Sequence, residues 1–291
     1  MAKFVALLAS GLSFGMLMAL VAMGFLLLYK ATGVINFAHG DLVTLGAYLA
    51  VWATVDLGLP TIWGYLLALA LMFVVGLLIE RIAYAPLRRR SQLVVVISTL
   101  AAALVIRALI SLWQGSNPRQ LATPVGDGSW QIFGANIAKQ RVLIVIVALV
   151  VIIAMLLIFQ RTSVGRQVRA LASDSEMSQL TGVRDRLVSA VAFGLSAVLA
   201  GLAGILISPL NEVDLTFGFS AMITAFAAAV LGGFGSLGGV VVGGLIIGLV
   251  QQLFGGYFFR EYADTLPFIV MFVIIALRPQ GLFAAFGRAR L

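Results

Sequence analysis

A short polar segment interrupts the hydrophobic sequence between residues 33 and 42. It reads GVINFAHGDL and places Asn36, His39 and Asp41 at the start of an apolar run. Asn36 precedes His39 by three residues and Gly40 by four, so these positions can share one helical face. Polar side chains within a membrane are costly unless partnered, and they often mark a pathway. Asn36, His39, Gly40 and Asp41 are therefore candidates for a solute pathway; helix capping and interhelical hydrogen bonding near the inner surface are the other interpretation.

A glycine-rich segment lies later in the chain. Small residues let helices approach closely where lipid supplies no hydrophobic drive, and several of these glycines have GxxxG spacing. The segment 232–239 is typical of a turn or a broken helix. Tight packing is one interpretation; the other makes Gly232, Gly233, Gly235 and Ser236 part of a flexible gate or an exposed-backbone substrate site. The glycines are Gly232, Gly233, Gly235, Gly238, Gly239, Gly243, Gly244 and Gly248.

The polar stretch 161–186 is long and patterned. Val168, Leu171, Ala172 and Leu180 can share one face of a helix while the charged residues point elsewhere, and Gly182 is a plausible helix stop. We predict a short amphipathic helix at the membrane surface, which either docks a soluble partner or lies on lipid headgroups. The candidate docking residues are Gly165, Arg166, Arg169, Ala170, Asp174, Glu176, Leu180 and Gly182.

Other chemistry is excluded or weakly supported. The chain has no cysteine and one histidine, which excludes a thiolate metal site and leaves little scope for a histidine-based one. No Gly-x-Ser-x-Gly, His-Glu-x-x-His or Walker pattern is present. We therefore predict a chain that is no enzyme and holds no metal or cofactor. Arg107 lies inside an apolar run, where snorkelling or ion pairing is favoured over substrate contact.

Composition points to a membrane protein. Of 291 residues, 62% are hydrophobic and 10% are charged, and the mean hydropathy is +1.12. A soluble domain carries about 25% charged residues. Long apolar runs without alternation favour helices, so we predict an all-α bundle of about eight or nine membrane segments. The runs are Phe4–Tyr29, Phe37–Val55, Ile62–Ile82, Leu93–Trp113, Val142–Phe159, Leu187–Ser208, Phe219–Leu231, Gly239–Phe254 and Leu266–Leu277.

Two of these runs are doubtful spans. Phe37–Val55 starts with polar residues and Phe219–Leu231 is short, so both are predicted to be broken or re-entrant helices, which survive where they line protein or a cavity. The formal net charge is +8, but the basic residues follow membrane topology and give no reason to expect nucleic acid. Basic residues mark cytoplasmic loops. They place 161–186 and the C-terminus inside, and the N-terminus and the loop 114–141 outside. Residues 1–291 are predicted to form one transmembrane domain.

Several segments resemble the LivH-type permeases of branched-chain amino acid ABC importers. GVINFAHGDLVTLGAY (33–48) is similar to the signature near the family's second helix, and GRQVRALASDSEMSQLTGV (165–183) to its cytoplasmic coupling loop. AFGLSAVLAGLAGIL (192–206), AVLGGFGSLGGVVVGGLIIG (229–248) and RPQGLF (278–283) resemble later parts of the family. Asp41 stands where the family often has Glu, which keeps the charge with a shorter reach.

The resemblance implies a permease subunit in the prokaryotic cytoplasmic membrane. A second permease, commonly LivM-like, would share the pathway, and two LivG/LivF-like ATPases would bind ATP and Mg and contact Gly165–Gly182. A periplasmic or extracellular binding protein would deliver the solute. The family also transports urea and short amides, so the solute is less defined than the fold. A secondary transporter or channel without an ATPase is the alternative.

Overall fold

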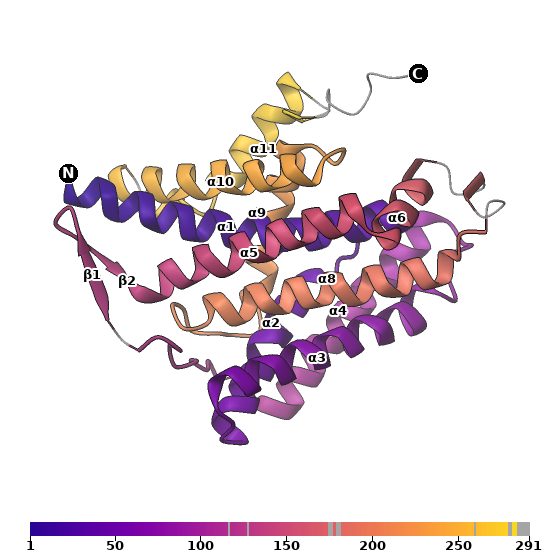
Figure 1. The fold of residues 1–291 in the computed structure, drawn as a ribbon, viewed down its shortest axis with the longest axis horizontal. Helices are drawn as coiled ribbons and strands as arrows, with labels where there is room; N and C mark the ends of the chain where they lie inside the picture. The colour runs from indigo at the N-terminus through magenta and orange to yellow at the C-terminus, as the bar shows by residue number, and fades with distance from the viewer. Residues whose placement is uncertain are drawn as a thin grey trace. The chain divides into compact units, whose positions relative to one another are not determined.

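The computed structural model describes residues 1–115, 117–126, 128–173, 177–178, 182–258, 260–278 and 281–283. Each predicted hydrophobic run is helical in this part of the chain, and a further helix, α6, follows α5 (Figure 1). The α-helices are α1 (Ala2–Thr32), α2 (His39–Val51), α3 (Thr61–Ile79), α4 (Gln92–Gln114), α5 (Lys139–Arg161), α6 (Ser163–Ser173), α8 (Asp185–Ile207), α9 (Phe217–Gly232), α10 (Leu237–Tyr257) and α11 (Leu266–Leu277).

Proline and glycine set several of the helix ends. α3 follows Pro60, and Pro267 occupies the first turn of α11, where its missing N–H has no helical partner to lose. Gly33, Gly115 and Gly233 follow the ends of α1, α4 and α9 with φ of 71°, 77° and 85°. Left-handed backbone at these positions ends a helix and favours glycine.

The all-α polytopic fold class is confirmed. Among the described residues, six helices are long and apolar enough to cross a membrane: α1, α3, α4, α5, α8 and α10. The two runs predicted as doubtful spans form short helices: α9 has 16 residues, and α2 has 13, continued by the π-helical turn η1 (Trp52–Asp56). A full span needs about 20 residues.

The chain divides into two compact units. One contains 1–23, 122–153 and 221–291, and the other contains 24–121 and 154–220. We call the first the α10 unit and the second the α8 unit, after the helix around which each packs.

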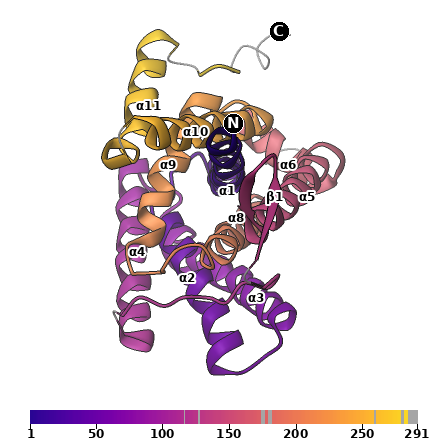
Figure 2. The same ribbon diagram turned by 90° about the vertical axis from the view of Figure 1, so that its left-hand side faces the viewer.

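In the α8 unit, α2 and α3 both lie along α8 (Figures 1 and 2). Glycines allow this approach. A methyl group added at Gly46 of α2 would overlap the backbone of Gly201 on α8, and one at Gly204 would overlap the carbonyl of Val43. α3 approaches α8 in the same way, since a methyl group at Gly76 of α3 would lie 2.5 Å from the Phe193 carbonyl oxygen of α8. Close backbone approach is therefore what joins these helices.

In the α10 unit, the glycine-rich helix uses two faces. Gly244 and Gly248 lie against Ala19 and Gly15 of α1, while Gly243 lies against Ala228 of α9. α1 and α10 run side by side in both views (Figures 1 and 2). The packing interpretation of the GxxxG series is thus the one that these contacts support.

The predicted outer loop contains a hairpin that the sequence analysis did not anticipate. Strands β1 (Ser129–Ile132) and β2 (Ala135–Ala138) pair antiparallel, with Ser129 opposite Ala138.

Further elements are the π-helical turn η2 (Glu80–Tyr84) and the 3₁₀ turn η3 (Arg260–Tyr262). In the α8 unit, Arg119 pairs with Asp56 at 3.0 Å and exchanges backbone hydrogen bonds with Val213, which ties this loop to the α8–α9 connection.

Gly248→Ala tests whether backbone contact holds α10 to α1. The added methyl would overlap Gly15, so we expect a loss of roughly 1–3 kcal/mol in stability, measured as a lower unfolding temperature in detergent. Gly238→Ala is the matched control in the same helix, because its methyl would meet nothing closer than 3.8 Å. Equal unfolding temperatures for the two variants would contradict the packing role.

Candidate functional site

The polar segment between α1 and α2 turns back along α1. The side chain of His39 lies beside Gly24 of α1, and its ring meets Phe25 edge-on at a centroid distance of 6.1 Å. Gly24 is eight residues, or about 12 Å of helix, before Thr32, where α1 ends. α2 therefore begins within the bundle, as predicted for a re-entrant segment, and its first residues are buried.

Asp41 and Arg107 form an ion pair between α2 and α4. Arg107 Nε lies 2.9 Å from Asp41 Oδ1, with side-chain exposures of 32% and 3%. The guanidinium also lies 6.0 Å from the ring centre of Phe219 in α9. Ion pairing, one of the interpretations favoured for Arg107, is thus observed. Because the carboxylate is deeply buried, it depends on this partner more than the half-exposed arginine does.

Other polar atoms at and before the start of α2 reach α8, α9 and α4. His39 Nδ1 lies 3.3 Å from Ser196 Oγ of α8, and Thr44 Oγ1 accepts a 2.9 Å hydrogen bond from the Gly218 N–H of α9. Thr99 of α4 accepts one from the Phe37 N–H at 3.3 Å. We call these polar residues the α2 cluster: Asn36, His39, Asp41, Thr44, Thr99, Arg107 and Ser196.

Asn36 leaves one polar atom without a partner. Its Oδ1 accepts a 3.0 Å hydrogen bond from the Ala38 N–H, which fixes the orientation of the amide. Nδ2 then points elsewhere, and among the described residues it has no hydrogen-bond partner although Asn36 is 3% exposed. A buried donor left unpaired in this way marks a place where a ligand or water can bind.

The predicted amphipathic helix is α6, and its apolar face is packed. Val168 and Leu171 form a buried cluster with Val188 in the first turn of α8. Side chains from the ends of α1 and α5, including Ala31 and Phe159, surround this cluster. α6 is therefore held against the bundle by its apolar face, with its polar face outward.

A tight corner fixes α6 to α5. A methyl group at Gly165 would overlap the Phe159 carbonyl. The Arg169 guanidinium donates to the carbonyl oxygens of Phe159 and Gln160 and lies over the Phe159 ring. It caps the end of α5, where helix carbonyls lack partners. Two of the candidate docking residues, Gly165 and Arg169, therefore build this corner.

The remaining docking candidates are distributed along the linker. Arg166 is exposed and Ala170 is half-buried. Gly182 has φ of 87°, and the next N–H, of Val183, donates to the Ser178 carbonyl oxygen at 3.1 Å. A positive φ is typical of the glycine that follows a helix, but residues 179–181 directly before Gly182 lie outside the described residues. Asp174, Glu176 and Leu180 lie outside the described residues.

The glycine-rich candidates belong to the turn between α9 and α10, in the other compact unit. Ser236 Oγ accepts a 3.1 Å hydrogen bond from the Gly239 N–H and so caps α10. Gly232 lies against Gly239, Gly233 adopts φ of 85°, and a methyl at Gly235 would meet open space. These contacts account for Gly232, Gly233 and Ser236 as packing and turn residues.

Two polar contacts near the α6 end of the α8 unit were not predicted. Arg88 pairs with Asp185 at 2.9 Å, and Ser189 donates a 2.9 Å hydrogen bond to Glu80. Both join the end of α3 to the start of α8. The signal in the sequence was the pair of acidic residues, Glu80 and Asp185, standing at the ends of apolar runs among arginines.

Comparison with known proteins assigns the family. The profile of the family described as "Branched-chain amino acid transport system / permease component" matches residues 7–275. The chain belongs to this permease family. The matched range includes both the α2 cluster and α6.

Curated relatives agree with this assignment. The chain is 32% identical to the high-affinity branched-chain amino acid transport system permease protein LivH of Escherichia coli K12, over 94% of this chain and 93% of that protein. It is 32% identical to BraD of Pseudomonas aeruginosa, named for the same system, over 94% of both chains. The ribose import permease RbsC of Bacillus subtilis is 29% identical over 76% of this chain and 68% of its own length.

A solved structure shares the fold. PsaBC from Streptococcus pneumoniae, solved in complex with Fab, superposes with a TM-score of 0.50 at 14% identity, covering 95% of this chain and 92% of that one. At this identity the likeness extends to the fold alone.

The Asp41–Arg107 pair gives an asymmetric prediction. Arg107→Gln leaves a buried carboxylate unpaired and should cost about 3 kcal/mol or more. Asp41→Asn leaves a half-exposed arginine and should cost less. The double variant should be more stable than Arg107→Gln alone. Unfolding temperatures in detergent measure all three; additive losses would show that the pair does not couple α2 to α4.

Proposed function

We propose that this chain is the permease subunit of an ABC importer that moves branched-chain amino acids inward by alternating access. Membership of the permease family along almost the whole chain carries the proposal. The chain supplies the membrane pathway and no catalytic residue. ATP and Mg are bound by separate ATPase subunits.

The assembly in this proposal has four kinds of contact. A second permease, LivM-like in a heterodimer, shares the pathway. Two LivG/LivF-like ATPases dock on α6 from the cytoplasm, and a solute-binding protein delivers the amino acid on the other side. Lipid covers the exposed apolar faces. The N-terminus lies outside and the C-terminus in the cytoplasm, following the distribution of basic residues.

α6 is the coupling element in this mechanism. Its apolar face is held by Val168, Leu171 and Val188, and its polar face is left for the ATPase. When ATP closes the ATPase pair, a displacement of α6 passes directly to α8. α8 in turn contacts α2 and α3 through Gly201, Gly204 and the backbone at Phe193, so the start of α2 moves with it. ATP binding shifts the populations of two states only if the ATPases contact α6 differently in each.

The α2 cluster is the proposed solute contact. Asn36, His39, Gly40 and Asp41 lie at a helix start within the bundle, and Asn36 Nδ2 is a buried donor without a hydrogen-bond partner in the part of the chain that the structure describes. An amide N–H suits the α-carboxylate of an amino acid. We assign Gly232, Gly233, Gly235 and Ser236 to the α9–α10 turn instead.

Reconstitution tests the function as a whole. The chain is coexpressed with its partner permease and ATPases, purified and placed in liposomes with the binding protein. We expect uptake of leucine, isoleucine or valine that requires ATP and Mg, and copurification of two ATPase subunits. Uptake by the chain alone, driven by an ion gradient, would instead establish a secondary transporter or channel.

Arg166→Glu tests docking at the polar face of α6. Reversing the charge of this exposed residue should reduce ATPase copurification at least severalfold, because an acidic group of the ATPase that faces Arg166 would then meet a like charge. Arg89→Glu is the matched control, an exposed arginine outside α6. Full ATPase recovery with Arg166→Glu would remove α6 as the docking element.

Asn36→Ser tests the solute contact. Serine retains an oxygen that can accept the Ala38 N–H but removes Nδ2, so we expect a higher KM for uptake, by roughly tenfold, with little change in unfolding temperature. Ser98→Ala is the control, since Ser98 bonds the Ala83 carbonyl oxygen, outside the α2 cluster. An unchanged KM for Asn36→Ser would place the solute elsewhere.

A further inference from the structure

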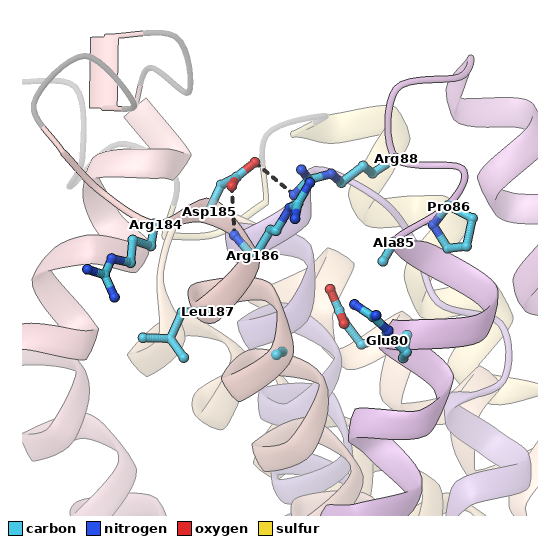
Figure 3. A pocket seen from close by; sticks show the side chains of 10 residues that line it. Glu80, Ala85, Pro86, Arg88, Arg184, Asp185, Arg186 and Leu187 are labelled. Carbon is cyan, nitrogen blue, oxygen red and sulfur yellow. Dashed lines mark hydrogen bonds and ion pairs between the residues drawn. The ribbon is translucent and has the colours of Figure 1, made fainter.

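A cavity lined by arginines lies at one end of the α8 unit. Its volume is about 790 Å³, and it is formed by the end of α3 with η2 on one side and the start of α8 on the other (Figure 3). In the figure, Arg184 and Leu187 lie to one side of Asp185, with Glu80, Ala85 and Pro86 on the other. The charged lining residues are Glu80, Arg81, Arg88, Arg184, Asp185 and Arg186.

The charge of this cavity is not balanced internally. Of its charged groups, Asp185 is paired with Arg88 at 2.9 Å, and Glu80 accepts a hydrogen bond from Ser189. Arg81, Arg184 and Arg186 are exposed, and their side chains form no ion pair with any residue that the structure describes. These residues bring three exposed guanidiniums to one cavity, without an ion-pair partner among the described residues, and so favour the binding of an anion there.

The position of the cavity defines the kind of anion. Tyr84 ends one candidate span and Asp185 begins another, so the guanidiniums lie where a bilayer places its phosphates. The cavity wall is also apolar: Pro86, Leu187 and Ala190 line it, and Leu187 is 57% exposed. Guanidinium groups above an apolar wall match a phosphate carried on acyl chains.

We propose that this cavity binds the headgroup of an anionic phospholipid. The lipid phosphate lies between Arg184, Arg186 and Arg81, and its acyl chains follow the exposed side chain of Leu187. Because Val188 in the same turn of α8 packs against α6, a bound lipid braces the base of α6. This inference goes beyond the proposed function and requires only that the chain is embedded in a membrane.

The experiment uses the full chain, delipidated in detergent and titrated with dioleoylphosphatidylglycerol or dioleoylphosphatidylcholine, with bound lipid counted by native mass spectrometry. Wild type should bind the anionic lipid with clear preference. R184Q/R186Q should weaken its binding about tenfold or more, at roughly fivefold for each arginine. R89Q/R90Q removes the same charge from exposed arginines outside the cavity and should leave binding unchanged.

Further arms separate the alternatives. R184K/R186K keeps the charge and should retain most of the binding, which preserves the test if the glutamine variant folds poorly. Equal loss in R184Q/R186Q and R89Q/R90Q, or equal binding of both lipids, would overturn the site. Complete displacement of the lipid by millimolar inorganic phosphate would also overturn the site and would assign it to a free anion. Loss of ATPase copurification in R184Q/R186Q with lipid binding intact would assign the arginines to a protein contact instead.

Discussion

Close backbone approach at glycine is the constraint on which the α8 unit depends. Within lipid, apolar helices gain little by burying side chains against one another, so contact between backbones must hold them. α8 meets α2 at Gly201 and Gly204 and meets α3 through the backbone beside Phe193. A larger residue at these positions would move α2 and α3 outward, and the polar groups that they carry would lose their partners.

One helix thereby links the two regions that the proposed mechanism needs. The first turn of α8 holds α6 through Val188, and further along the helix Ser196 reaches His39 at 3.3 Å. Motion imposed on α6 therefore has a packed route to the start of α2. The arginine cavity lies at the same first turn, where lipid phosphates would contact the element that moves.

The sequence predicted the six spanning helices well because each is a long apolar run, and it predicted α6 because Val168 and Leu171 recur at helical spacing. It also indicated the turn before α10 from its glycines. The hairpin at 129–138 was missed, since four-residue strands carry too little alternation. The partner of Asp41 was not predicted, because Arg107 lies 66 residues away and the contact is set by tertiary packing. The unpaired Nδ2 of Asn36 likewise depends on a local turn that composition does not specify.

A measurement of the side of the membrane on which α6 lies tests the account most directly. The chain contains no cysteine, so Ser173→Cys and Trp130→Cys each introduce one thiol, at the end of α6 and in the β1 strand. A membrane-impermeant maleimide added to intact cells should label the cysteine at position 130 and should reach position 173 after the cells are opened. Labelling of position 173 in intact cells would contradict the orientation and, with it, the coupling of α6 to a cytoplasmic ATPase.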